Sequence, residues 1–284
     1  MNYILQALLP TVSVLVIATA SACQHQQNLF TKETIKQSVN HKIHPTKVAP
    51  QTKVIEPTKI LPTKLHKLRH QEIQFNFVTF DSRKQQLIIA DQLKGPGSVW
   101  KDSLSAAKSY QGIAAINAGF FTPEGKPLGM VISNGSQRGS NNSSSLGSGI
   151  FYQDKAEAKI IRRAGWKTLS KSPPPQLLQS GPMLLEHSKT IKGLSSQSSR
   201  VRSFIATDGK HHWCIGHASS CTLEQLSSAL SSLDISDFEI TAALNLDGGR
   251  SSDFWVSPAV TGGPVTIRPF WNKPVRNFLI LKNK

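Results

Sequence analysis

The sequence contains few cysteines. There are three among 284 residues: Cys23, Cys214 and Cys221. So small a number excludes a zinc site built from cysteines. In an oxidising compartment Cys214 and Cys221 can form a disulfide that closes a short loop. The alternative is a pair of unlinked thiols, and the spacing alone does not decide between the two.

Charged side chains are absent from the first 23 residues, MNYILQALLPTVSVLVIATASAC. An apolar run followed by small residues predicts a signal peptide over residues 1–22, and hence an exported chain. Two kinds of processing fit. The Ala-Ser-Ala sequence suits an ordinary signal peptidase, which would give a freely soluble periplasmic protein. Together with Cys23 it resembles a bacterial lipobox, in which case Cys23 carries a lipid anchor and the protein is a membrane-anchored lipoprotein.

Acidic residues are also scarce, since 17 Asp and Glu oppose 33 Lys and Arg and leave a net charge of +16. Residues 24–70 supply +7 of that charge and are rich in Lys, Gln, Thr, Pro and His. Such a composition buries too little apolar surface to fold, so we predict a disordered basic linker up to residue 70. This tether either keeps the chain soluble or attracts anionic envelope polymers and lipid head groups. Nucleic acid is not an expected partner, because the chain is exported and no nucleic-acid motif interrupts the basic run.

Residues 71–284 have the hydrophobic patterning of a folded domain. A helix is predicted near residues 102–110, and a second begins at Thr222, where Thr222 and Gln225 fit a capping box. We predict a single mixed α+β domain in which helices flank a central β-sheet. The predicted strands cover residues 73–77, 87–90, 112–116, 128–133, 149–153, 159–163, 202–207, 212–215, 241–246 and 277–281.

Four stretches with glycine follow predicted strands, where loops usually build sites. A glycine there lets the backbone approach a ligand closely or adopt a positive φ. The stretches are NAGFF (117–121), PLGM (127–130), QSGPM (179–183) and NLDGG (245–249).

Seven motifs occur in a recognisable order over about residues 71–284: AINAGFF, PLGMVISNG, QSGPML, RSFIATDG, TLEQLSSAL, AALNLDGGRSS and VRNFLIL. In this order they resemble the phosphodiester glycosidase family. The resemblance implies hydrolysis of a glycosyl-phosphate diester at the anomeric carbon, often on exopolysaccharide or envelope glycans. One position departs from the family pattern: Arg250 stands where glycine is frequent. We predict neither a cofactor nor a metal.

Glycosidic cleavage normally takes two carboxyl groups. A phosphomonoester is already a good leaving group, so the predicted site needs one firmly held carboxylate and donors around the phosphate. Asp247 is the candidate nucleophile or base, because an apolar run fixes its strand and Gly248-Gly249 leaves its far side open. The alternative is an Asp that only forms a turn, since Asp-Gly is a common turn dipeptide.

Two further residues complete the predicted catalytic set. Arg202 is predicted to bind phosphate through its forked guanidinium group, although a surface arginine on an edge strand is the alternative. Asn117 is predicted to bind a pair of sugar hydroxyls, or else to cap its own turn. The N–H groups of residues 248–250 are predicted to form an anion nest. The predicted substrate-binding residues are Gly119, Phe121, Gly129, Ser180, Gly181, Gly248, Gly249, Arg250, Ser251 and Ser252.

The sequence therefore predicts an exported hydrolase that acts on sugar-phosphate diesters. The alternative is a non-catalytic envelope lipoprotein that binds phosphorylated glycans, because the same arginine and glycine residues serve binding alone.

Overall fold

The computed structural model describes residues 59–169 and 172–284. The predicted signal peptide, the predicted lipidation site at Cys23 and most of the predicted linker lie outside these residues. The described part is mostly β-structure arranged in three sheets, and not one central sheet flanked by helices. None of its helices is long and apolar enough to cross a membrane.

Every strand pairing within the three sheets is antiparallel. The first sheet has the order β1 (Lys64–His70), β2 (Ile73–Asp81), β13 (His212–Cys221), β12 (Arg200–Thr207), β14 (Ala242–Asn245), β10 (Met183–Glu186), β11 (Lys189–Thr190). The second has the order β16 (Val265–Ile267), β15 (Phe254–Val256), β4 (Ala114–Asn117), β17 (Asn277–Asn283), β3 (Gln85–Asp91). The third has the order β6 (Ser136–Arg138), β5 (Val131–Ser133), β9 (Gln176–Ser180), β7 (Gly149–Gln153), β8 (Ala158–Arg162).

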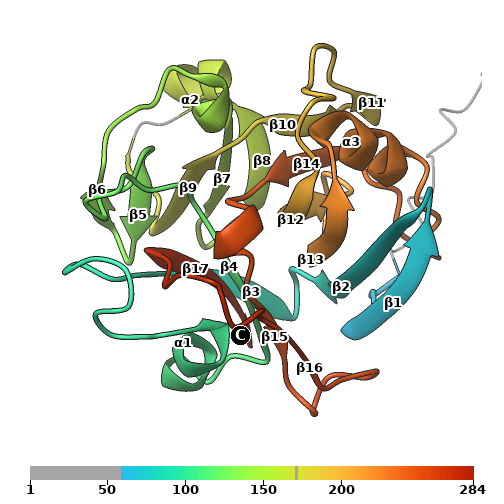
Figure 1. Ribbon diagram of the computed structural model, residues 1–284, viewed down its shortest axis with the longest axis horizontal. Helices are drawn as coiled ribbons and strands as arrows, with labels where there is room; N and C mark the ends of the chain where they lie inside the picture. Colours follow the sequence, from blue (N-terminus) through green and yellow to red (C-terminus); the bar gives the residue numbers. More distant parts are fainter. Residues whose placement is uncertain (1–58, 170–171) are drawn as a thin grey trace, which may run out of the picture. The chain divides into compact units, whose positions relative to one another are not determined.

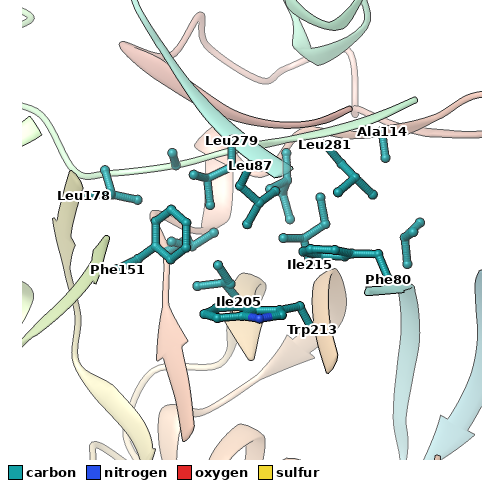
Figure 2. Packing of buried hydrophobic residues seen from close by; sticks show 14 of the residues in the cluster. Phe80, Leu87, Ala114, Phe151, Leu178, Ile205, Trp213, Ile215, Leu279 and Leu281 are labelled. Carbon is teal, nitrogen blue, oxygen red and sulfur yellow. The ribbon is translucent and has the colours of Figure 1, made fainter. Parts of the chain in front are cut away.

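The three sheets share one hydrophobic core. Figure 2 shows side chains from all of them in contact, among them Trp213 and Ile205 from the first sheet, Leu279 from the second and Phe151 from the third. Successive side chains of a strand point to opposite faces, so each sheet has a second face to cover. In β12, for example, Ile205 lies in the shared core while Phe204 belongs to a separate cluster on the other face.

A short helix covers the outer face of each sheet (Figure 1). Buried residues of α3 (Leu223–Ser231) pack with the first sheet, and those of α1 (Ser103–Ser109) pack with the second. Trp166 of α2 (Arg163–Leu169) packs against the third. The predicted capping box of α3 is present, because Thr222 accepts from the Gln225 N–H while the Gln225 side chain accepts from Thr222.

The predicted linker boundary at residue 70 is wrong. Lys64–His70 form β1, which pairs along its full length with β2. Leu61 and Leu65 are buried, and the Leu61 N–H donates to the Asp81 carboxylate at 3.2 Å. β1 is an edge strand and buries only part of its side chains. Its composition is therefore as polar and basic as that of the residues before it, and the sequence pattern did not distinguish the two.

Of the two alternatives for Cys214 and Cys221, the structure has the unlinked thiols and not the disulfide. Both are buried, and both lie on β13 at its third and last positions. Seven residues of extended chain separate them by roughly 23 Å, whereas a disulfide needs Cα atoms within about 7 Å.

Strands of two different sheets meet where β12, β14 and β4 begin or end. The Leu246 N–H donates to the Ser203 carbonyl oxygen at 2.9 Å, and the Asp247 N–H donates to the Ala118 carbonyl oxygen at 2.9 Å. The chain leaving β14 is therefore clasped between the first and second sheets. Its next residues form a single 3₁₀ turn, η2 (Gly249–Ser251), the orange-red coil near the centre of Figure 1.

Candidate functional site

Asp247 lies where the chain passes from β14 into the η2 turn. Gly248 is required directly after it, because a Cβ atom there would lie 2.8 Å from the Val201 carbonyl oxygen. Gly249 adopts φ +62°, a left-handed conformation that favours glycine. The two glycines thus let the loop press against β12, and this fixes the backbone that carries the carboxylate.

The Asp247 carboxyl group is surrounded by protein although part of the residue reaches the surface. Burial raises its pKa to about 6, and hydrogen bonds from Ser251 and from the Gly248 N–H offset part of that rise. The Gly248 N–H donates to Asp247 Oδ1 at 2.9 Å. A carboxyl group with such a pKa is mostly ionised at neutral pH yet remains basic enough to attack or to take a proton.

Asn117 holds the backbone of Asp247 by a hydrogen bond. Its Nδ2 donates to the Asp247 carbonyl oxygen at 2.5 Å. Its Oδ1 accepts from Ser203 Oγ at 2.6 Å and from the Asp253 N–H at 3.0 Å. Asn117 has no exposed surface, so the predicted direct contact with sugar hydroxyls is wrong, and the residue positions the loop instead.

Sequence reasoning did not assign Ser203 or His217 to the site. They are register partners on β12 and β13, so their side chains point to the same face of the first sheet. His217 is buried, and its Nδ1 has no hydrogen-bond partner among the described residues. Burial lowers the pKa of His217 to about 4, so it is neutral at physiological pH. A polar residue on the core-facing side of an apolar strand was the available sequence signal.

Arg202 is a buried cation beside the loop, with 8% of its surface exposed. Its Nε donates to the Cys221 carbonyl oxygen at 3.0 Å and its Nη2 donates to the Ser198 carbonyl oxygen at 2.7 Å. Burial lowers its pKa, but a guanidinium group stays charged. No carboxylate of the described chain forms an ion pair with it. A buried charge of this kind favours an anionic ligand.

Two arginines flank the glycines of the loop. Arg202 Cδ lies 3.8 Å from the position that a Cβ atom on Gly248 would occupy, and Arg200 Cδ lies 3.8 Å from the corresponding position on Gly249. The two glycines that follow Asp247 therefore lie against the side chains of Arg202 and Arg200.

The predicted anion nest retains two of its three donors. The Gly248 N–H is occupied by the Asp247 carboxylate. Within the described structure the N–H groups of Gly249 and Arg250 form no hydrogen bond. Ser251 bonds to the Asp247 carboxylate, whereas Ser252 is buried, with its Oγ 3.4 Å from Ser203 Oγ.

The remaining predicted glycines and Ser180 are buried, and the prediction that they bind substrate directly is wrong. Added Cβ atoms would lie 2.9 Å from Leu178 Cδ1 at Gly119, 3.0 Å from the Gln179 carbonyl oxygen at Gly129, and 2.3 Å from the Ser145 carbonyl oxygen at Gly181. Ser180 Oγ donates to the Asn245 carbonyl oxygen at 2.9 Å. These residues let backbones of different sheets approach each other closely.

Phe121 is half-buried and packs against the cluster between α1 and the second sheet. The structure therefore gives this ring a place in the core and does not show it as a wall for a sugar.

Asp253 is a second carboxylate that the sequence reasoning missed. It is fully buried and accepts hydrogen bonds from Ser103 Oγ at 2.5 Å, the Ser103 N–H at 3.1 Å and Arg268 Nη1 at 2.8 Å. Burial raises its pKa, while Ser103 and Arg268 oppose the rise. Ser103 is the first residue of α1, and Arg268 directly follows β16. The hydrogen bonds to Asp253 therefore hold both segments against the chain that follows the η2 turn.

Five hollows of about 230 to 590 Å³ lie on the described surface, and none of these five is lined by Asp247 or Arg202. The candidate site therefore consists of the loop that carries Asp247 and the neighbouring Arg200 and Arg202, and it lies outside these five hollows.

Comparisons with known proteins agree with the fold. A sequence model described as phosphodiester glycosidase matches residues 110–282. The catalytic domain of zebrafish N-acetylglucosamine-1-phosphodiester alpha-N-acetylglucosaminidase, auto-inhibited by its pro-peptide, is similar with a TM-score of 0.56 and 15% identity, over 81% of this chain and 85% of that one. A hypothetical protein from Synechocystis is similar with a TM-score of 0.55 and 15% identity, over 78% of this chain and 61% of that one. A search of curated proteins found no match.

Proposed function

Because this chain belongs to the phosphodiester glycosidase family, we propose that it hydrolyses a glycosyl-phosphate diester between the anomeric carbon and the phosphate oxygen. One observation carries the proposal. The loop of Asp247, a carboxylate whose pKa burial raises to about 6, packs at Gly248 against Arg202, a buried arginine that has no carboxylate partner among the described residues. That pairing suits a substrate with an electrophilic carbon next to an anionic leaving group.

In this mechanism ionised Asp247 attacks the anomeric carbon or removes a proton from the water that does. The bond between that carbon and the phosphate oxygen breaks, and its electron pair leaves with the phosphomonoester. Water supplies the hydroxyl group of the released sugar, so the sum of the reaction is hydrolysis.

The departing phosphomonoester gains negative charge, and nearby donors stabilise it. The guanidinium group of Arg202 supplies the positive charge, and the free N–H groups of Gly249 and Arg250 supply neutral donors. Asn117 and Ser203 hold the loop in place without touching substrate.

We also propose that the protein is exported and acts on envelope or exopolysaccharide glycans. The predicted signal peptide supports export. The net charge of +16 supports attraction to phosphate-bearing glycans and other anionic envelope polymers, and the predicted lipid anchor would hold the chain at a membrane.

Product analysis tests the activity directly. The full chain is incubated with a panel of nucleotide sugars and other glycosyl-phosphate diesters, and released sugar and phosphomonoester are identified. We expect Asp247→Asn to abolish turnover, whereas Asp234→Asn, a change at an exposed carboxylate away from the loop, leaves it intact. Full turnover by a folded Asp247→Asn protein would remove that residue from the reaction.

The alternative is a protein that only binds phosphorylated glycans. Arg202 favours it equally, since an uncompensated buried cation serves binding as well as catalysis. Tight binding of a diester that is never cleaved, over the whole panel, would select this alternative.

A further inference from the structure

A small hollow beside α2 is lined by two aromatic rings and a run of prolines. It has a volume of about 230 Å³, and its walls include Tyr152, Trp166 and the three prolines at 173–175. The two rings lie 5.5 Å apart between their centroids, with 55° between their planes. Trp166 is half-buried, so part of this side chain is open to a ligand. The hollow therefore offers a concave apolar and aromatic surface.

Two carboxylates line the same hollow. Asp154 and Glu157 belong to the turn between β7 and β8. Hydrogen bonds from Lys159 and from Tyr152 hold the pKa of Glu157 below its usual range, so this carboxyl group is ionised at neutral pH. None of the described residues that line the hollow is a lysine or an arginine. In a chain whose net charge is +16, this hollow is thus a place where a cation is attracted.

Three of the four oxygens of these carboxylates already accept hydrogen bonds. Tyr152 Oη donates to Glu157 Oε1 at 2.6 Å, and Lys159 pairs with Glu157 Oε2. Asp154 Oδ1 accepts from the Ala156 and Glu157 N–H groups at 2.7 and 2.8 Å. A cation that carries N–H groups would leave most of them without an acceptor here. A quaternary ammonium group has no N–H to donate, so it gains the attraction of the charges without that loss.

The hollow is separate from the loop that carries Asp247. At the beginning of β7, Gly149 pairs with Ser180, and Ser180 Oγ donates to the carbonyl oxygen of Asn245, which ends β14 before that loop. Asp154 follows the other end of β7, five residues or roughly 17 Å further along. A ligand in the hollow therefore leaves the Asp247 loop unoccupied.

We propose that this hollow binds a quaternary ammonium group, and that its ligands are molecules of the choline type. The methyl groups of the cation pack on the indole ring of Trp166, while the ring electrons and the charges of Asp154 and Glu157 attract the positive nitrogen. The inference goes beyond the proposed function, and it holds whether or not the chain hydrolyses a diester.

Calorimetric titration of the full chain with choline chloride tests the proposal, at an ionic strength kept constant with NaCl. The matched probe is 3,3-dimethylbutan-1-ol, which has the shape of choline but a carbon atom in place of the charged nitrogen. We expect choline to bind about tenfold more tightly than this neutral probe. Equal Kd values would show an apolar pocket and would overturn the cation site. Tighter binding of ethanolamine than of choline would overturn the quaternary class.

Substitutions locate the binding. Trp166→Ala should weaken the Kd for choline about tenfold, and Trp166→Phe should keep most of the affinity because it retains an aromatic face. The matched control is Trp100→Ala, which should leave the Kd unchanged. The rings of Trp100 and Tyr110 also lie 5.5 Å apart, but Trp100 lines none of the five hollows described above.

Glu157→Gln tests the charge, because it removes the negative charge and keeps an acceptor for Tyr152. We expect it to weaken the Kd for choline about fivefold. An unchanged Kd in both Glu157→Gln and a folded Trp166→Ala would overturn the site, and so would an equal loss in Trp100→Ala. Binding of a methyl glycoside instead of choline, lost in Trp166→Ala, would overturn it in favour of a sugar site. The comparison of choline with its neutral probe needs no variant, so it decides even if Trp166→Ala does not fold.

Discussion

Asp247 is a carboxylic acid that the fold holds where its charged form is disfavoured. Burial raises its pKa to about 6, and the residue must be ionised to attack or to act as a base. We therefore expect kcat/KM to rise with pH and to level off above an apparent pKa near 6. A pH–rate profile of the full chain checks this. A profile that falls through pH 6 would instead make Asp247 a proton donor.

The same shift predicts the effect of Asp247 on stability. In the folded state the residue keeps its proton up to about pH 6, whereas in the unfolded state it loses the proton near 3.8. The folded state thus binds more protons between these values, and stability falls as pH rises through that window.

At pH 7 this cost is about 3 kcal/mol, because the pKa of Asp247 rises from 3.8 to about 6 on folding. We expect Asp247→Asn to be more stable than wild type by about 1 to 3 kcal/mol at pH 7, with the gain shrinking toward pH 4. Urea unfolding at both pH values measures it. An equal gain at both would show that charge is not the cause.

The catalytic roles of Asp247 and Arg202 stay predictions, whereas the direct sugar contact predicted for Asn117 does not fit its complete burial. The residue type and its position after a strand do not show whether a side-chain amide points to solvent or forms all its hydrogen bonds within the protein. Asp253 was missed for the same reason, because its partner Arg268 is 15 residues away and nothing local pairs them. Hydrogen-bond partners distant in sequence are set by the tertiary fold.

At the scale of elements, the ion pair between Asp253 and Arg268 fastens α1, η2 and the segment after β16 together. Removing one partner leaves a buried charge without compensation. We expect Arg268→Ala to destabilise the fold by about 3 kcal/mol and to loosen the turn of residues 269–272, whose last carbonyl oxygen accepts from Arg268 Nη2.

Thermal unfolding with hydrogen exchange at residues 270–273 measures both effects. Arg69→Ala is the matched control, because Arg69 pairs with Glu72 at the surface and its loss should change little. Unaltered exchange in Arg268→Ala would show that the hydrogen bonds of residues 271–273 with Arg250 and Ser252 are enough to hold the turn.

Strands with a clear apolar pattern were predictable, including the short β5 and β14, whereas the polar β1 and the short β15 and β16 were not. Strands such as β2, β12 and β17 contain seven to nine residues, enough for an alternation of apolar and polar side chains or a continuous apolar run to be visible. Strands β15 and β16 have three residues each, which is less than two periods of that alternation. They form because neighbouring strands provide the hydrogen bonds.

At the scale of the whole molecule, the division into three sheets could not be predicted from local patterns. β4 lies between β15 and β17, its partners being more than 130 residues away in the chain. Hydrophobic patterning shows that a strand is buried on a given face, but not which sheet it joins.

The extent of the folded unit gives a direct test of the corrected boundary. Leu65, which the sequence placed in the linker, belongs to the core shared by the three sheets. We expect Leu65→Ala to destabilise the protein by about 2 to 4 kcal/mol, because it leaves a cavity. Leu93→Ala, at a residue 63% exposed, should change stability by less than about 0.5 kcal/mol. Chemical denaturation measures the free energy of unfolding of both variants. Equal losses of stability would show that Leu65 is not part of the folded core.

The Lys59 carbonyl oxygen is bonded by Arg83 Nη2 at 3.1 Å and lies 2.9 Å from His212 Nε2, while the Leu61 N–H bonds to Asp81. These contacts lie at one end of β13, and Arg202 faces Ala218, six residues or about 20 Å further along the same strand. Tension applied through the N-terminal side of the chain therefore loads the Asp81 end first. A protein held from that side therefore takes up load at the Asp81 end of β13, away from the loop that carries Asp247.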